Sequence, residues 1–242
     1  MKTERLTFEQ HMEQLARRHG VHSVFSDFLT LLMCAFSLGQ REEEYLKTIR
    51  KYEKPEAYRI SETLGALVVE MTGDGTGMVD VLGDYFERFL SYGKNGQFFT
   101  PQNICDMMAR LMNPTSPLER ILDPACGSGR MLMAMAKVNR FATFFGADND
   151  RNCACMCAIN MCLNGMYGEV AWMNSITNQF YAAWQIHPTV KGCPCITQIS
   201  EKQSYIHMKL PSTSNLTGNV YPPAKLEGVS IPTTAKQLLF EF

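Results

Sequence analysis

We predict an α/β fold, preceded by an α-helical domain, from three features of the 242-residue sequence. Apolar residues recur at helical spacing over about the first 92 residues. Beyond them, short apolar runs alternate with helical stretches, which is the pattern of a parallel sheet with crossover helices. The first of these runs leads into a turn that contains two glycines, as expected where a strand passes into a helix.

Residues 1–92 are predicted to form a helical N-terminal domain. In the stretch from Val24 to Phe36, Ser26 and Asp27 can act as capping residues, so the pattern fits either one helix or two. Pro55 suits the first turn of another helix. We expect helices over residues 8–15, 24–36, 41–52, 60–71 and 79–92.

Residues 93–177 are predicted to form the α/β core, after a boundary at Gly93-Lys94-Asn95-Gly96. Three apolar runs predict strands over residues 120–123, 143–148 and 170–173. Helices are expected over residues 101–111, 128–138 and 151–163.

Residues 178–242 are predicted to form an irregular C-terminal segment with a few short strands, because prolines and polar clusters interrupt its pattern. The best candidate for regular structure is a hairpin in which residues 196–199 and 205–210 pair across the turn 200–203. His187, beside Pro188, is expected in a loop rather than as a general base.

The bulk properties favour an ordinary cytoplasmic protein. The formal net charge is −1, so any nucleic-acid contact must depend on local patches or on a partner chain. No apolar run approaches the roughly 18 residues of a membrane span, and the N-terminus lacks the apolar region of a secretory signal. Nine cysteines, an odd number without regular spacing, indicate a reducing compartment.

The most informative motif is Asp123-Pro-Ala-Cys-Gly-Ser-Gly129, placed between a predicted strand and a predicted helix. Gly127 and Gly129 allow a tight turn and a close approach of the backbone to a ligand. The turn ends at a helix N-terminus, which offers unpaired N–H groups. Asp148 ends the next strand, where an acid suits hydrogen bonds to ribose hydroxyls. A tight turn without a ligand would explain the glycines but not the acid.

This motif resembles the cofactor loop of the N-6 adenine-specific DNA methyltransferases. Upstream, Gly96-Gln-Phe-Phe-Thr-Pro101 resembles the family's other cofactor motif. Within the family, the chain most resembles the modification (M) subunits of type I restriction-modification systems, which also begin with a helical domain. The resemblance spans roughly residues 80–177. It implies a class I S-adenosylmethionine-dependent methyltransferase domain, which is Rossmann-like, and the cofactor S-adenosyl-L-methionine.

The same resemblance implies roles for individual residues. Phe99 and Thr100 would contact the methionine end of the cofactor, and Asp123 and Gly127 would line the same pocket. Asp148 would bind the ribose hydroxyls. At the end of the third strand the family usually places an acid that accepts from the adenine amino group. Asn174 stands there instead, and its amide oxygen would take that role.

The family's catalytic motif, Asn/Asp-Pro-Pro-Tyr/Phe, is absent from the sequence. In the family its side chain and backbone carbonyl accept the hydrogens of the target adenine amine, and its aromatic ring stacks on the flipped base. We therefore assign no catalytic residue and expect the C-terminal half of the sheet to be incomplete. Two functions stay open: a DNA adenine methyltransferase that acts alone or is completed by another subunit, and a non-catalytic relative that binds cofactor, DNA or a partner. The implied partners are DNA and a specificity or restriction subunit.

The cysteines between Cys153 and Cys162 allow two interpretations. Together with Cys193 and Cys195 they could supply zinc ligands. However, helical residues two apart point to different faces, so Cys155 cannot readily join Cys153 and Cys157. We expect small buried cysteines that pack the helix on the sheet, and no metal.

Overall fold

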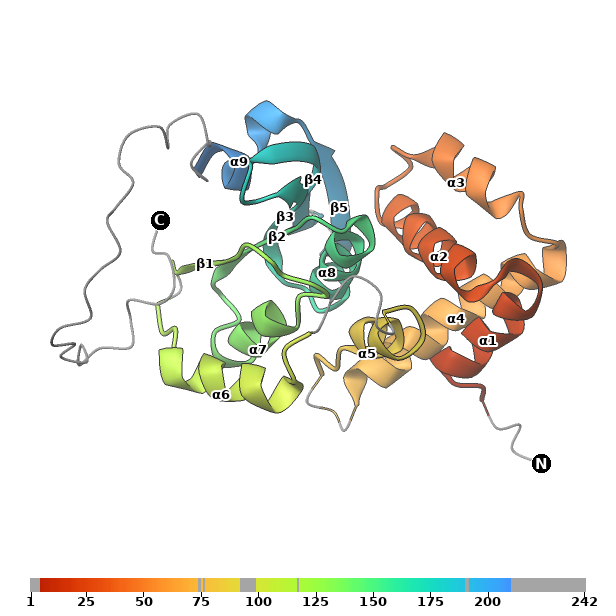
Figure 1. Cartoon of the computed structure of the whole chain (residues 1–242), viewed down its shortest axis with the longest axis horizontal. Helices are drawn as coiled ribbons and strands as arrows, with labels where there is room; N and C mark the ends of the chain where they lie inside the picture. Colours follow the sequence, from red (N-terminus) through yellow and green to blue (C-terminus); the bar gives the residue numbers. More distant parts are fainter. Residues whose placement is uncertain are drawn as a thin grey trace, which may run out of the picture.

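The computed structural model describes residues 5–73, 75, 77–91, 99–116, 118–189 and 192–209. In this part of the chain, a group of helices lies beside a five-stranded sheet (Figure 1). The α/β fold class with a preceding helical domain is thus confirmed. The expected boundary at 93–96 and residues 210–242 lie outside the described residues, so the domain limits stay predictions.

The helices expected in the N-terminal domain are confirmed, with shifted ends. The first begins at a capping box, in which Thr7 Oγ1 accepts from the Gln10 N–H and Gln10 Oε1 accepts from the Thr7 N–H. Pro55 lies in the first turn of the fourth helix, as expected. The helices are α1 (Phe8–His19), α2 (Val21–Ala35), α3 (Glu42–Ile49), α4 (Lys54–Thr72) and α5 (Val81–Phe89).

Helix α2 is one continuous helix rather than two. Thr30 Oγ1 donates to the Ser26 carbonyl, and the Asp27 carboxylate pairs with Lys51 and Tyr52 of the segment that follows α3. Ser26 and Asp27 therefore lie inside one helix and do not mark a new helix start. The Asp27 contact joins α2 to the end of α3.

The predicted strand–helix alternation is confirmed in the second part of the chain. Three strands pair in parallel, with Asp123 opposite Gly146 and Asp148 opposite Trp172. The carboxyl ends of these strands therefore meet at one edge of the sheet. The elements are α6 (Gln102–Met112), β1 (Arg120–Asp123), α7 (Arg130–Val138), β2 (Thr143–Asp148), α8 (Arg151–Leu163) and β3 (Tyr167–Asn174).

Two further strands extend the sheet beyond Thr177, which corrects the expected irregular segment. β4 (Gln179–Pro188) pairs antiparallel with β3, and β5 (Pro194–Ile199) pairs antiparallel with β4, giving the order β1-β2-β3-β4-β5. The expected hairpin of 196–199 with 205–210 is wrong, because 201–203 is a 3₁₀ turn and α9 (Tyr205–Lys209) is helical. His187 lies in β4, not in a loop.

Helix α9 is held in place by a buried carboxylate on β3. Glu169 accepts hydrogen bonds from Ser204 Oγ (2.5 Å) and from the N–H groups of Tyr205 and Ile206. These backbone N–H groups belong to the first turn of α9, where the helix itself offers them no acceptor. Glu169 thus fixes a helix that local sequence pattern assigned to a strand.

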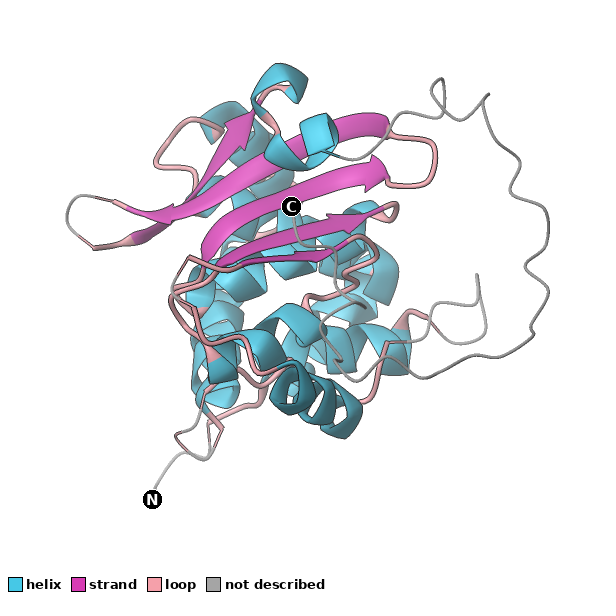
Figure 2. Cartoon of the chain, turned by 90° about the vertical axis from the view of Figure 1, so that its left-hand side faces the viewer, coloured by secondary structure: helices cyan, strands magenta, loops and turns pink. Residues whose placement is uncertain are grey.

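The two faces of the sheet have different coverings. Alternate residues along each strand point to opposite faces. One set, which includes Ile121, Phe144 and Val170, packs in one apolar cluster with α7, α8 and the N-terminal helices. The other set, which includes Leu122 and Phe145, packs with Ile206 of α9. Figure 2 shows the strands side by side with the larger helices on one side.

Helix α8 lies in the middle of the molecule, in contact with both α2 and β3. All four of its cysteines are buried and none is in a disulfide bond, which confirms the expected packing role. β5 also reaches the helical domain, because the Ile196 N–H donates to the Phe36 carbonyl (2.9 Å). The helical part and the sheet therefore share one core.

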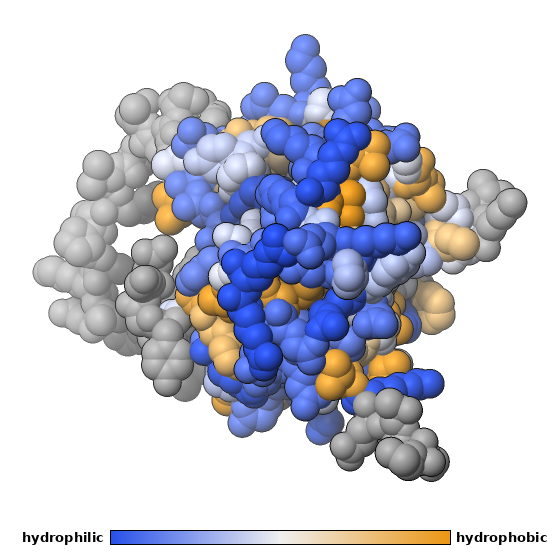
Figure 3. Space-filling model, turned by 90° about the vertical axis from the view of Figure 1, so that its right-hand side faces the viewer, coloured by the Kyte–Doolittle hydropathy of each residue, from blue (hydrophilic) through white to orange (hydrophobic). Residues whose placement is uncertain are grey.

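Within the described ranges, no helix is long and apolar enough to cross a membrane. The outer face of the helical domain is largely hydrophilic, with its apolar side chains in separate patches (Figure 3).

Candidate cofactor site

The turn after β1 has the conformation that its glycines predict. Gly127 and Gly129 have φ values of +54° and +85°, in the left-handed region that favours glycine. The Cys126 N–H donates to the Ala147 carbonyl (2.9 Å) of the next strand, and the Gly129 N–H donates to the Cys126 carbonyl (2.8 Å). These hydrogen bonds fix the turn against β2, and the turn leads into α7, which begins at Arg130.

Asp148, at the end of β2, contacts this turn directly. Its Oδ2 accepts from the Gly127 N–H (2.9 Å), and its Oδ1 accepts from the Asp150 N–H (2.8 Å). The two parts of the expected site, 21 residues apart in sequence, therefore lie side by side. A carboxylate offers about four lone-pair positions, so Asp148 can still accept from a ligand.

Burial raises the pKa of both carboxyl groups at this edge of the sheet. For Asp148 the hydrogen bonds from Asp150 and Gly127 act in the opposite direction without cancelling the rise. For Asp123 burial is the largest cause, the Ala125 N–H opposes it, and the nearby charge of Asp148 adds to it. Two carboxyl groups with raised pKa values therefore lie at this end of the strands, where a positively charged neighbour would favour their ionised forms.

Phe99 and Thr100 lie against the turn, although the motif that carries them is only partly described. The Phe99 ring stacks on Phe86 of α5 at 5.8 Å and 15°, and a Cβ at Gly127 would meet this ring at 2.8 Å. The Phe99 N–H donates to Glu87 Oε1 (3.0 Å), and the Thr100 carbonyl accepts from Arg130 Nη1 (3.3 Å).

Asn174 is placed differently from what its expected role requires. Its Oδ1 accepts from the N–H groups of Ile176 (3.0 Å) and Thr177 (3.1 Å), which uses both lone pairs of the amide oxygen within its own turn. The next residue, Ser175, donates to the Pro124 carbonyl (2.7 Å) and ties the end of β3 to the cofactor turn. Asn174 therefore lies near the site, but with its acceptor already occupied.

Sequence analysis missed the charged residues that support the turn. Asp80, Asp84 and Glu87 of the α5 region surround the guanidinium of Arg130, the first residue of α7. Ser128, which was expected to start α7, donates its hydroxyl to Asp80 instead. The one local signal was Arg130 itself, because a cation at a helix N-terminus is unfavourable without a counter-charge.

We predict that Asp123→Asn makes the ligand-free chain more stable at neutral pH. The folded-state pKa of Asp123 is raised, so its stabilising contribution is complete below the unfolded pKa of about 3.9 and is lost as the pH rises through the folded pKa. Removing the charge should add roughly 0.5–2 kcal/mol to the free energy of unfolding at pH 7, as other stabilising substitutions do. Denaturation of both proteins at pH 7 and near pH 4 checks the sign. A variant less stable than the wild type at pH 7 would contradict it.

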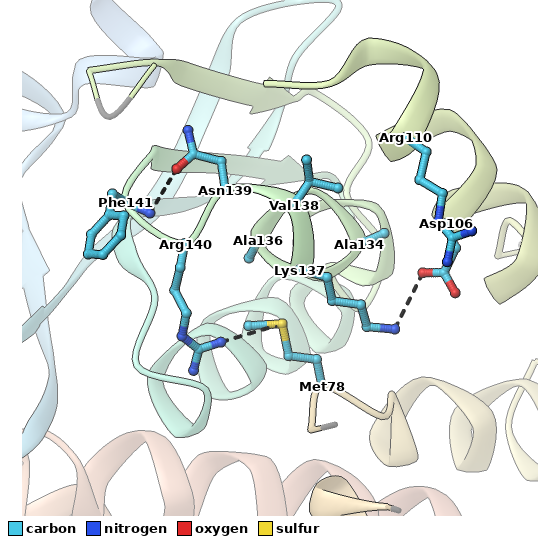
Figure 4. Close-up of a pocket in the computed structure, with 10 residues that line it drawn as sticks. All are labelled: Met78, Asp106, Arg110, Ala134, Ala136, Lys137, Val138, Asn139, Arg140 and Phe141. Carbon is cyan, nitrogen blue, oxygen red and sulfur yellow. Dashed lines mark hydrogen bonds and ion pairs between the residues drawn. The ribbon is translucent and has the colours of Figure 1, made fainter. Parts of the chain in front are cut away.

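A separate groove of about 670 Å³ lies between α6, α7 and the loop after α7 (Figure 4). Arg110, Lys137 and Arg140 line it, and Lys137 pairs there with Asp106 (3.3 Å). This groove is at the amino end of β2, whereas the turn is at the carboxyl ends of the strands, and none of the six expected cofactor residues lines it. Across the described segments, no group of three or more His, Cys, Asp or Glu residues could hold a metal ion.

Comparison with known proteins matches residues 77–191 to the N-6 DNA Methylase family. Two relatives are the methylase subunits of the type I restriction enzymes MpnII of Mycoplasma pneumoniae (30% identical over 100 residues) and MjaVIII of Methanocaldococcus jannaschii (35% over 95 residues). Each match covers 36% of this chain, but only 18% and 16% of the respective relative. A solved type I methyltransferase subunit from Streptococcus thermophilus is similar at 20% identity with a TM-score of 0.34, over 66% of this chain and 36% of that one.

Proposed function

We propose, from the premise that residues 77–191 belong to the N-6 DNA methylase family, that this chain binds S-adenosylmethionine at the turn after β1. The observation that carries the proposal is the hydrogen bond between the Gly127 N–H and Asp148 Oδ2 (2.9 Å). It brings a glycine turn at a helix N-terminus together with an acid at the next strand end, the arrangement that holds nucleoside cofactors in open α/β sheets.

The residues at this edge fit the cofactor. Asp123 carries a partly buried carboxylate, and its pKa is raised by burial and by the charge of Asp148. A cationic ligand nearby would lower this pKa and stabilise the ionised carboxylate. S-adenosylmethionine supplies an electrophilic methyl group on a positively charged sulfur. Asp148 would accept from the ribose hydroxyls, and Phe99, Thr100, Asp123 and Gly127 would line the methionine end. Asn174 would act through its NH₂ group, because its Oδ1 already accepts from Ile176 and Thr177.

We further propose that the chain holds the methyl donor without using it alone. The ligand crevice of an open α/β sheet lies where strand order reverses, between two strands that diverge from one point. Among the described strands, β1 pairs only with β2 and forms the edge of the sheet. Among the described residues, a strand therefore borders the crevice beside Asp123 on one side only. In addition, the Asn/Asp-Pro-Pro-aromatic motif that would accept the hydrogens of the target amine is absent from the sequence.

The relatives named above are methylase subunits of type I restriction enzymes, which supports DNA as the substrate and a further subunit as the partner that completes the site. The second candidate function is a non-catalytic relative that binds cofactor or a partner chain. The missing acceptor motif favours it. The two differ in whether any assembly that contains this chain methylates adenine.

Calorimetry with S-adenosylhomocysteine tests the proposed cofactor site. We expect a single site, and we expect Asp148→Ala to weaken binding by about 1–3 kcal/mol, as for a lost hydrogen-bond acceptor. Asp106→Ala is the control, because it removes a carboxylate that pairs with Lys137 at the separate groove. No binding by the wild type at millimolar ligand would refute the proposal.

A further inference from the structure

A buried carboxylate of the α5 region connects three other parts of the α/β core. Asp80 is the N-terminal cap of α5, and its side chain is 1% exposed. Oδ1 accepts from the Gly83 N–H (3.0 Å) and from Asn160 Nδ2 (2.9 Å) of α8. Oδ2 accepts from Ser128 Oγ (2.5 Å) in the cofactor turn and from Arg130 Nε (2.9 Å) at the start of α7. Asn160 Nδ2 also donates to the Ser128 carbonyl (2.9 Å), so three of these four partners belong to the cofactor turn, follow it directly or contact it.

Arg130 extends this network to the other cofactor segment. Its side chain is 7% exposed, and Nη2 pairs with Asp84 (2.8 Å) and Glu87 (3.2 Å) of α5, while Nη1 donates to the Thr100 carbonyl (3.3 Å). The guanidinium also lies over the Phe99 ring at 5.7 Å. One arginine thus connects α5, α7 and residues 99–100. The planar guanidinium suits this role because its five N–H donors point in fixed directions.

Helix α5 holds residue 99 by contacts of its own. Glu87 accepts the Phe99 N–H, and Phe86 stacks on the Phe99 ring. The same ring lies against Gly127. Both segments that are expected to touch the cofactor therefore contact one helix, α5, which lies within the residues predicted to form the helical N-terminal domain.

The energetics point to positioning rather than to stability. The attraction between two buried charges offsets little more than the cost of removing them from water, and an apolar pair of similar volume often gives an equally stable fold. A buried pair that is fully hydrogen-bonded does, however, specify one geometry. Gly83 shows how close this geometry is, because a Cβ there would lie 2.6 Å from Ser128 Oγ and closer still to Asp80.

We propose that Asp80 and Arg130 are positioning residues through which helix α5 sets the shape of the cofactor turn and of the Phe99–Thr100 segment. The consequence for affinity rests on the proposed cofactor function, whereas the structural coupling does not. A displacement of α5 by a partner that binds the helical domain would reach the cofactor pocket through these two side chains.

Hydrogen–deuterium exchange on the ligand-free chain, combined with S-adenosylhomocysteine calorimetry, tests the coupling with three variants. Asp80→Asn keeps the shape but removes the charge that faces Ser128 and Arg130. Gly83→Ala keeps every charge but pushes the Asp80 carboxylate and the Ser128 hydroxyl away from α5, although a change from glycine to alanine within a helix normally stabilises the helix. Arg88→Gln is the control, because Arg88 is also on α5 but pairs with Glu9 of α1.

We expect Asp80→Asn and Gly83→Ala to speed exchange of the amides of residues 125–131 and to weaken binding, each by on the order of tenfold, with α1 and α2 unchanged. Arg88→Gln should change neither. Exchange at residues 125–131 equal to that of Arg88→Gln would overturn the inference, and so would a uniform rise over the whole chain. If the wild type binds no ligand while both variants still loosen the turn, the cofactor proposal fails and the coupling stands.

Discussion

Gly127→Ala is expected to lower the affinity for S-adenosylhomocysteine by on the order of a hundredfold, through both backbone strain and a steric clash. The residue has a φ of +54°, and a Cβ would meet the Phe99 ring at 2.8 Å. Relief of that contact must move either the ring or the turn. Each carries part of the proposed pocket, since the Gly127 N–H donates to Asp148. Calorimetry on the purified variant measures the loss.

Gly165→Ala is the matched control for this prediction. Gly165 has a similar φ of +63°, but nothing lies within 4 Å of a Cβ there. Both variants pay the left-handed strain of roughly 1–2 kcal/mol, and only Gly127→Ala adds the clash. Gly165→Ala should therefore lower stability while it keeps the affinity. Affinity of Gly127→Ala within threefold of wild type would contradict the role given to the Phe99–Gly127 contact.

Local pattern predicted the central elements well because each has its own signal. β1 and β2 have the expected bounds, because each is a short apolar run that ends at an aspartate, Asp123 or Asp148. Helix α8 also has its expected bounds, fixed at the start by the Asp150 side chain, which accepts from the N–H groups of Asn152 and Cys153.

The strands after Thr177 could not be found in the same way. Pro188 and Pro194, which suggested irregular structure, face each other at the outer end of the β4–β5 pair, where a strand tolerates a missing N–H. α9 was assigned to a strand because its helical first turn depends on Glu169, 36 residues before Tyr205. Such distant partners leave no trace in local periodicity.

The candidate site was only half predictable for a similar reason. The glycine turn and Asp148 form a pattern with a known spacing, so their contact could be expected. The network of Asp80 and Arg130 spans 50 residues and joins two predicted domains. Arg130 near a helix start is the one signal that could have suggested a nearby acid, but nothing in the sequence identifies Asp80 as that acid.

The purified chain is expected to transfer no methyl groups to DNA. The amino nitrogen of adenine is a poor nucleophile, because its lone pair is delocalised into the ring. Groups that position it and accept its hydrogens should account for several orders of magnitude in rate, and binding of the donor alone does not replace them. We predict that the chain, with tritiated S-adenosylmethionine and mixed double-stranded DNA, gives no incorporation above a blank without enzyme.

Robust transfer that Asp123→Ala abolishes would refute this prediction. The acceptor would then have to come from beyond Thr177, and the structure narrows the choice. His187 is excluded, because β4 runs antiparallel to β3 and places Ile186 opposite Gly168, near the amino end of β3. The proposed methyl donor lies at the opposite ends of the strands, near the carboxyl end of β3, where Gln179 pairs with Asn174. Tyr221-Pro222-Pro223 lies outside the described residues, so Tyr221→Phe would be the first variant to test whether this segment supplies the acceptor.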